Sequence, residues 1–178
     1  MNKMEVFISE NAFLSMVIAA VEVFRKETLG ILLGYRCENS YIVENAIAYQ
    51  SCERYASEVE RNHNAHRRIE YFLEHVRSPA KLIGDFHSHT QFGDNKGGFV
   101  PSKEDIVEMK NGGVYFIIEI NKRAKSQVWN YNRNGTMSGT VGEYFLKIAA
   151  WYRDENTNNP VLGKICCPFG LGFNWNYI

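Results

Sequence analysis

The stretch KLIGDFHSH, which runs from Lys81 to His89, predicts a buried β-strand that ends in two histidines. On a strand, residues i and i+2 point to the same face and lie about 6.6 Å apart along the chain. His87 and His89 can therefore offer two imidazole nitrogens to one metal ion at about 2.0–2.1 Å. A solvated histidine pair at a strand end is the alternative, because two ligands do not hold a zinc ion and a third must come from elsewhere.

A third ligand is available sixteen residues after His89, where the chain predicts the start of a helix. The segment PSKED, from Pro101 to Asp105, places Ser102 at the cap and Asp105 in the first turn. The pattern S-x-x-D is also a variant of the capping box, in which both side chains only satisfy backbone donors. Together with the two histidines, at a strand-to-loop-to-helix junction, Asp105 becomes the candidate third ligand of a metal.

The remaining apolar pattern predicts strands and helices in alternation. We expect strands at Met4–Ile8, Thr28–Tyr35, Tyr41–Tyr49, Lys81–His89 and Val114–Ile120, and helices from a Ser9 cap to about Arg25, over Val59–Val76, and from Ser102 to the Asn111–Gly113 break. Short strands are expected from Gln127 onward, and Glu143–Tyr152 fits a strand or a helix equally well. The pattern indicates an α+β layer sandwich, with a mixed β-sheet flanked by helices.

The length and the net charge of the chain favour a single-domain protein and give no sign of a nucleic-acid partner. The chain has 178 residues, which favours a single domain over residues 1–178 with room for a proper core. Twenty basic residues balance twenty acidic residues, so the composition offers no sign of a nucleic-acid partner.

Two further features favour a cytoplasmic protein without a membrane partner. The apolar run from Ala12 to Val21 is shorter than the roughly 20 residues that span a bilayer, and acidic residues stand where a secretory signal needs basic ones. The four cysteines show no C-x-x-C spacing, so we expect reduced thiols of a cytosolic protein.

An earlier glutamate completes a recognisable set. Glu27 precedes the apolar strand of KETLGILLG, which carries Gly30 and Gly34; taken alone, Glu27 is a charged residue at a helix–strand junction. The combination of E-x-x-G-x-L-x-G, GDFHSH and S-x-x-D in one chain resembles the JAMM (MPN+) metallopeptidases, the family of zinc-dependent isopeptidases. The resemblance covers about Met4 to Ile120.

The resemblance implies a fold and a role for each residue of the set. The fold would be the cytidine-deaminase-like MPN fold. His87, His89 and Asp105 would bind one Zn²⁺ ion, and Glu27 would accept a proton from the zinc-bound water and pass it to the leaving amine. Ser102 would hydrogen-bond the oxyanion of the tetrahedral intermediate. Zinc lowers the pKa of its bound water to about 7 and polarises a carbonyl, so the chemistry is consistent.

The resemblance also implies the substrate class. The expected activity is cleavage of a peptide or isopeptide bond at the C-terminal tail of a ubiquitin-like protein, and trimming of a short precursor tail stays open. The alternative is a non-catalytic MPN scaffold in a larger assembly, although such relatives typically lose one or more ligands and this chain keeps all five positions. The oligomeric state and the identity of the substrate are left open.

The loop after the histidines departs from the family pattern. Thr90 to Pro101 is twelve residues, where the family usually has seven, and Thr90 stands where the family often has proline. Surface loops absorb added residues at little cost, so we expect an exposed, mobile loop beside the zinc. It either shapes which tail enters, using Phe92 and Phe99, or is a passive insertion.

Other histidines and aromatics have simpler interpretations. His63 and His66 fit a solvated helix face, and His75 fits a favourable cation near a helix C-terminus. The late aromatic residues, which are either core or a docking edge, are Phe169, Phe173, Trp175 and Tyr177.

Overall fold

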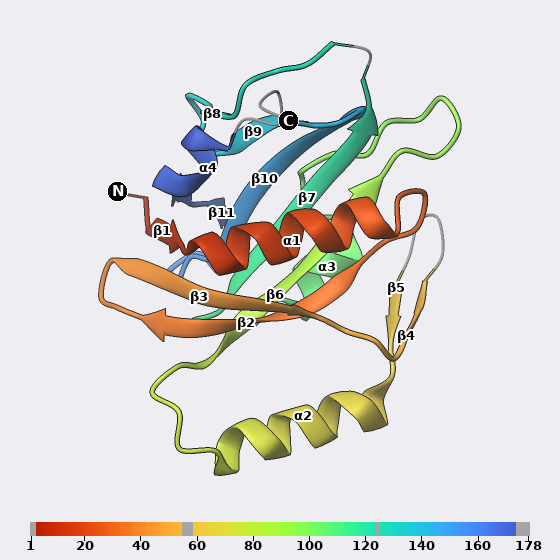
Figure 1. Cartoon of the computed structure of the whole chain (residues 1–178). Helices are drawn as coiled ribbons and strands as arrows, with labels where there is room; N and C mark the ends of the chain where they lie inside the picture. The colour runs from red at the N-terminus through yellow and green to blue at the C-terminus, as the bar shows by residue number, and fades with distance from the viewer. Residues whose placement is uncertain (1–2, 55–58, 124, 174–178) are drawn as a thin grey trace.

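The computed structural model describes residues 3–54, 59–123 and 125–173, and most of its strands join one sheet (Figure 1). The strands are β1 (Glu5–Ile8), β2 (Leu29–Arg36), β3 (Ser40–Ala48), β4 (Cys52–Arg54), β5 (Val59–Arg61), β6 (Lys81–Thr90), β7 (Val114–Lys122), β8 (Asn130–Tyr131), β9 (Met137–Val141), β10 (Tyr144–Arg153), β11 (Pro160–Leu162) and β12 (Lys164–Cys166). The helices are α1 (Glu10–Glu22), α2 (His63–His75), α3 (Lys103–Glu108) and α4 (Pro168–Gly172).

The large sheet has ten strands in the order β12-β1-β3-β2-β6-β7-β10-β9-β8, with β11 paired to β10. β6 runs parallel to β7 and antiparallel to β2, and β1 is parallel to both of its neighbours. The prediction of a mixed sheet with flanking helices is therefore confirmed. The ambiguous segment Glu143–Tyr152 is a strand, β10, which lies between β7 and β9.

The glycines of the GILLG segment on β2 mark places where neighbouring strands approach closely. A Cβ atom on Gly34 would lie 1.9 Å from the carbonyl oxygen of Ile42 on β3. A Cβ atom on Gly30 would lie 2.3 Å from the ring of Phe86 on β6. Both distances are too short for any side chain, so β2 needs glycine at these positions to pack between β3 and β6.

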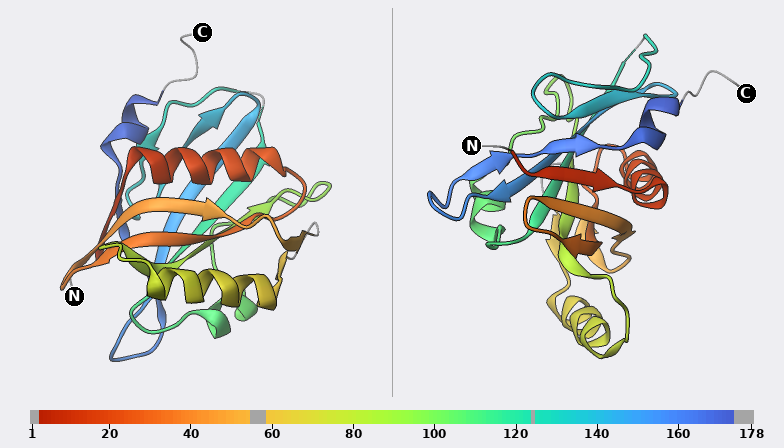
Figure 2. Two further views of the ribbon diagram at one scale, coloured as in Figure 1. Left: turned by 60° about the horizontal axis from the view of Figure 1, so that its bottom comes forward. Right: turned by 90° about the vertical axis from the view of Figure 1, so that its left-hand side faces the viewer.

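The helices cover the two faces of the sheet (Figure 2). α1 packs on the first face, where Ser9 caps it as predicted and its side chain accepts a hydrogen bond from the Ala12 N–H. Phe13, Met16 and Ala20 of α1 are fully buried there. The opposite face carries α3 and α2, whose Ile69 and Leu73 pack against a smaller cluster of Leu29, Ile31 and Tyr49. The open part of this second face becomes the site described below.

Three helices are shorter than the sequence predicted. α1 ends at Glu22, before the expected Arg25, whose φ of 79° is not helical. The expected helix from Val59 begins only at His63, because Val59–Arg61 pairs as β5 with β4 and the Asn62 side chain caps the helix. α3 ends at Glu108, before the expected break at 111–113. There the Arg153 side chain of β10 donates hydrogen bonds to the carbonyls of Ile106 and Met109, and this holds the end of the helix.

The C-terminal part contains the expected short strands and one helix that was not predicted, α4. Phe169 of α4 and Phe173 make edge contacts with the ring of Phe13 on α1, with centroid distances of 6.0 and 5.5 Å. These two late aromatics therefore belong to the core. Trp175 and Tyr177 lie outside the described residues.

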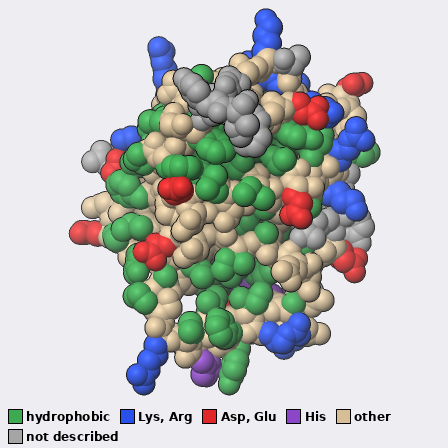
Figure 3. Space-filling model, viewed as in Figure 1, with side chains coloured by type: hydrophobic (Ala, Val, Ile, Leu, Met, Phe, Trp, Pro, Cys, Tyr) green, Lys and Arg blue, Asp and Glu red, His purple; other side chains and the backbone are tan. Residues whose placement is uncertain are grey.

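Hydrophobic side chains are scattered over the face of the molecule that carries α1 and β3 (Figure 3). Ile18 on α1 and Ile47 on β3 are among the exposed ones. Single exposed apolar residues are ordinary on protein surfaces, and we assign no ligand to them. Among the described residues, no helix combines the length and the apolar character that crossing a membrane requires.

Candidate metal centre

The second half of β6 points alternate side chains into the open part of the second face. Asp85, His87 and His89 lie on that side, whereas Phe86 on the other side is fully buried in the core beneath α1. His87 is buried and His89 is half-buried. The alternation of an extended strand therefore brings the two histidines to one point, as the sequence predicted.

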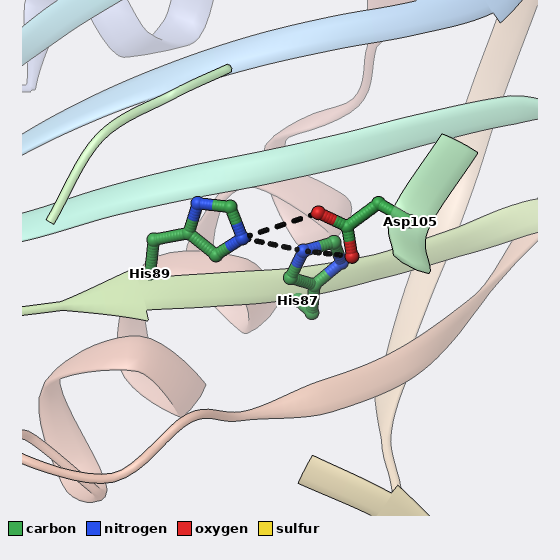
Figure 4. Close-up of side chains that lie close together, drawn as sticks. All are labelled: His87, His89 and Asp105. Atoms are coloured by element: carbon green, nitrogen blue, oxygen red, sulfur yellow. Dashed lines mark hydrogen bonds and ion pairs between the residues drawn. The ribbon is translucent and has the colours of Figure 1, made fainter. Parts of the chain in front are cut away.

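The first turn of α3 brings Asp105 to the same point (Figure 4). Ser102 is the helix cap: its Oγ accepts a hydrogen bond from the Asp105 N–H at 3.1 Å. In return, Asp105 Oδ2 accepts from the Ser102 N–H at 2.6 Å, so the reciprocal capping box is complete. The two interpretations of S-x-x-D are therefore compatible, because the carboxylate that caps the helix also faces the histidines.

The distances among the three side chains fit a small tetrahedral cation. His87 Nε2 is 3.2 Å from Asp105 Oδ1, His89 Nε2 is 3.4 Å from Asp105 Oδ2, and the two Nε2 atoms are 3.0 Å apart. Two ligand atoms bound tetrahedrally at about 2.1 Å from one zinc ion would lie roughly 3.4 Å apart. The triad thus has the donor types of such a site, and one ligand atom from each residue lies within 4.8 Å of the others, so the three residues could hold a metal ion.

The electrostatics of the triad keep the aspartate in its ligand form. Burial by itself would raise the pKa of Asp105, but hydrogen bonds from His87 and His89 outweigh it and hold that pKa well below its usual range. Burial would lower the pKa of His87, but the hydrogen bond and charge of Asp105 prevail and raise it. Asp105 is therefore ionised at neutral pH, and the site attracts a cation or a proton.

Glu27 lies beside the triad, on the segment that leads into β2. This segment is fastened to β6, because the Thr28 N–H donates to Ser88 Oγ at 2.9 Å and the Ser88 N–H donates to the Thr28 carbonyl at 3.1 Å. Glu27 is only 9% exposed and lines the same cleft as the triad. The structure thus brings together all five residues that the sequence singled out.

The cleft over the triad has a volume of about 600 Å³ and is rich in carboxylates. Its lining residues are Glu27, Leu29, Glu60, His63, Asp85, His87, His89, Ser102, Glu104, Asp105, Glu108, Met109 and Tyr115. Sequence reasoning missed most of the outer ones. Asp85 had a usable signal, since it lies two residues before His87 on the same strand face. Glu60 and Tyr115 come from β5 and β7 and had none.

The loop after the histidines is less free than the sequence suggested. Thr90 is buried within β6, and its Oγ1 accepts a hydrogen bond from the Arg25 N–H at 3.1 Å. Phe92 is 63% exposed, whereas Gly97 and Phe99 are half-buried against the sheet. The expectation of an exposed loop is therefore confirmed for residues 92–96 and wrong for Thr90, Gly97 and Phe99, which lie against the sheet.

The three histidines of α2 have different surroundings. His66 is not on a solvated face: its Nδ1 makes a hydrogen bond with the buried hydroxyl of Tyr49, and its Nε2 lies 3.1 Å from Glu70. This pair fastens α2 to the end of β3. His63 is exposed at the cleft, and His75 lies in the last turn of α2 as predicted.

The fold and this site define an α+β domain with a two-histidine, one-aspartate candidate metal centre at the junction of β6 and α3. A comparison with known protein families is consistent with this class: the model of the family described as prokaryotic homologs of the JAB domain matches residues 9–132. The chain belongs to this family.

Comparison with solved structures supports the fold. The solution structure of protein DSY2949 from Desulfitobacterium hafniense is similar over 91% of this chain and 92% of that chain, with a TM-score of 0.58 and 14% identity. At this identity the likeness shows the fold alone. No curated protein matches the sequence significantly.

Proposed function

We propose that the protein is a zinc-dependent hydrolase of the JAMM type, which cleaves a peptide or isopeptide bond at the C-terminal tail of a ubiquitin-like protein. The observation that carries the proposal is the triad: two histidines and an aspartate whose ligand atoms lie within 4.8 Å of one another, in a cleft that also contains a buried glutamate and a serine. When bound, zinc would lower the pKa of a water ligand and polarise the substrate carbonyl.

The residues of the chain would divide the remaining work. Glu27, held beside the triad by the pairing of Thr28 with Ser88, would accept the proton of the attacking water and deliver it to the leaving amine. The Ser102 Oγ already accepts from a backbone N–H, and its own proton remains available to donate to the carbonyl oxygen as charge develops there. Asp105 and the two histidines would hold the ion.

The fold and domain assignment form part of the same proposal. We take residues 1–178 as one domain with the cytidine-deaminase-like MPN arrangement, which the continuity of the sheet from β12 to β8 supports. The proposed compartment is the cytoplasm, since all four cysteines are free thiols.

Metal content and cleavage test the proposal together. Protein purified without added metal should contain about one zinc ion per chain, and the Asp105→Asn variant should contain much less. The protein should also cleave at least one member of a panel of tailed and isopeptide-linked ubiquitin-like proteins, and a chelator should stop this cleavage. Finding that the purified protein contains no metal and takes up no added zinc would refute the proposal. Tight zinc binding without cleavage of any panel member would instead favour the non-catalytic scaffold.

A further inference from the structure

The second half of the loop after β6 is held by three adjacent strands. We call residues Gly97, Gly98 and Phe99 the 97–99 segment. Each of its three consecutive carbonyl oxygens accepts a hydrogen bond from a side chain of a different strand. The donors are Asn121 Nδ2 of β7 to Gly97 at 3.3 Å, His89 Nδ1 of β6 to Gly98 at 3.0 Å, and Trp151 Nε1 of β10 to Phe99 at 3.0 Å. One of these donors is a residue of the candidate metal triad.

Asn121 is the anchor of this arrangement. Its side chain is 3% exposed, and its amide is fully used. Oδ1 accepts from the Gly97 N–H at 2.9 Å, while Nδ2 donates both to the Gly97 carbonyl and to Glu119 Oε1, the latter at 2.9 Å. The amide thus takes the place of a neighbouring strand and binds both backbone groups of one residue. A buried amide with every group satisfied fixes its partners firmly.

Gly97 can lie at this position only because it has no side chain. A Cβ atom there would be 2.1 Å from the carbonyl oxygen of His89. The segment therefore lies directly on the backbone of the histidine that it contacts. Lys147 of β10 adds a further contact on the other side, with its ammonium 4.5 Å from the centre of the Phe99 ring.

The contact between His89 and Gly98 determines which ring nitrogen faces the metal. A carbonyl oxygen can only accept, so His89 Nδ1 must carry the proton. The protonated ring donates from both nitrogens, and its Nε2 then donates to Asp105, 3.4 Å away. When the ring is neutral and Nδ1 keeps its proton, Nε2 presents a lone pair to a metal. Metal-bound histidines commonly depend on such a partner at their second nitrogen, and its loss typically weakens metal binding 10–100-fold.

We propose that Asn121 and Trp151 are positioning residues, which hold the 97–99 segment so that the Gly98 carbonyl fixes the tautomer and orientation of His89 for metal binding. The long loop is then neither a gate nor a passive insertion, since it supplies the support of one ligand. This inference rests on metal binding at the proposed site and does not require that the protein be an enzyme.

Zinc affinity and the tautomer of His89 test the inference without any activity assay. Asn121→Ala should weaken zinc binding about 10–100-fold, measured by competition with a chromophoric chelator. Trp151→Phe removes the Nε1 donor and keeps an aromatic side chain, and it should weaken binding severalfold. The matched control is Gln91→Ala. Gln91 also binds this loop through its amide, to the Lys122 N–H at 3.0 Å and the Gly93 carbonyl at 2.9 Å, but among the described residues no hydrogen bond joins it to the 97–99 segment. Its zinc affinity should stay within about threefold of the native value.

The tautomer is read by long-range ¹⁵N–¹H NMR on metal-free protein at a pH where the ring is neutral. Native protein and Gln91→Ala should show His89 protonated at Nδ1, and Asn121→Ala should show a mixture. A native His89 protonated at Nε2, or a folded Asn121→Ala that binds zinc as tightly as the native protein, would overturn the inference.

If Asn121→Ala does not fold, Trp151→Phe decides, and unchanged zinc affinity in that variant refutes the role of the segment. Native protein that binds no zinc would overturn the proposed function instead. The tautomer in metal-free protein would still test the positioning of His89.

Discussion

Ser102 is assigned two roles, and two substitutions at this one position separate them. As the cap of α3, its Oγ accepts from the Asp105 N–H at 3.1 Å. As the proposed donor to the substrate oxygen, the same hydroxyl supplies its proton. Replacement by alanine removes both roles, whereas glycine is itself a good cap residue and removes chiefly the hydroxyl.

The structure sets the size of each effect. The second half of the capping box, from the Ser102 N–H to Asp105 Oδ2, uses a backbone donor and survives both substitutions. Only one cap hydrogen bond is lost, so Ser102→Ala should lower the free energy of unfolding by about 1 kcal/mol, and Ser102→Gly by only a few tenths. For a chain of this length, 1 kcal/mol corresponds to about 2–4 °C in Tm. Loss of a donor to a developing oxyanion should lower kcat about 10²–10³-fold in both variants.

Urea unfolding, zinc content and cleavage of the substrate found in the panel form the assay. Both variants should retain zinc, because neither removes a ligand. The two-role assignment requires that stability differs between the variants while kcat falls equally. Near-native kcat in Ser102→Gly would refute the role in chemistry and leave Ser102 as a cap alone. Equal, native stability in both variants would refute the role of the side chain as a cap.

Three further predictions follow from the site and from the sheet. Glu27→Gln should abolish cleavage while zinc content and Tm stay near native, because the amide keeps the shape and loses the capacity to accept a proton; near-normal cleavage would place the base elsewhere. His89→Ala should lose the bound zinc, as measured by elemental analysis, since two protein ligands hold zinc far more weakly than three; full zinc occupancy in this variant would rule out the assigned ligand set. Gly34→Ala should lower the free energy of unfolding by about 1–3 kcal/mol, because the new Cβ meets the Ile42 carbonyl on β3. The control is Gly172→Ala, where a Cβ meets nothing within 4 Å, and equal stability of the two alanine variants would contradict the close approach of β2 and β3.

The sequence by itself determined the elements that carry strong local signals. The apolar run that ends in His-x-His predicted β6, Ser9 predicted the cap of α1, and the S-x-x-D pattern predicted the start of α3. The candidate ligands could also be predicted, because the two-residue period of a strand places His87 and His89 on one face. These features depend on neighbouring residues, and the chain order alone specifies them.

Other boundaries depended on partners far away in the chain. Residues 59–61 are a strand because β4 pairs with them. α3 ends early, where the Arg153 side chain of β10 donates hydrogen bonds to the carbonyls of Ile106 and Met109. Glu143–Tyr152 became a strand between β7 and β9, since an apolar run of that length also suits a helix and only pairing decides. No local pattern records such contacts.

The surroundings of the candidate site were decided by tertiary structure alone. Asp105 meets the histidines across the fold, and Arg153 of β10 holds the end of the helix that carries it. Asn121 lies 32 residues after His89, and nothing in its neighbours marks it, yet the sheet brings its amide to Gly97. The local spacing of the chain thus fixed which residues could bind a metal. The order and register of the strands decided how those residues are held, because hydrogen bonds between distant side chains exist only once the sheet has formed.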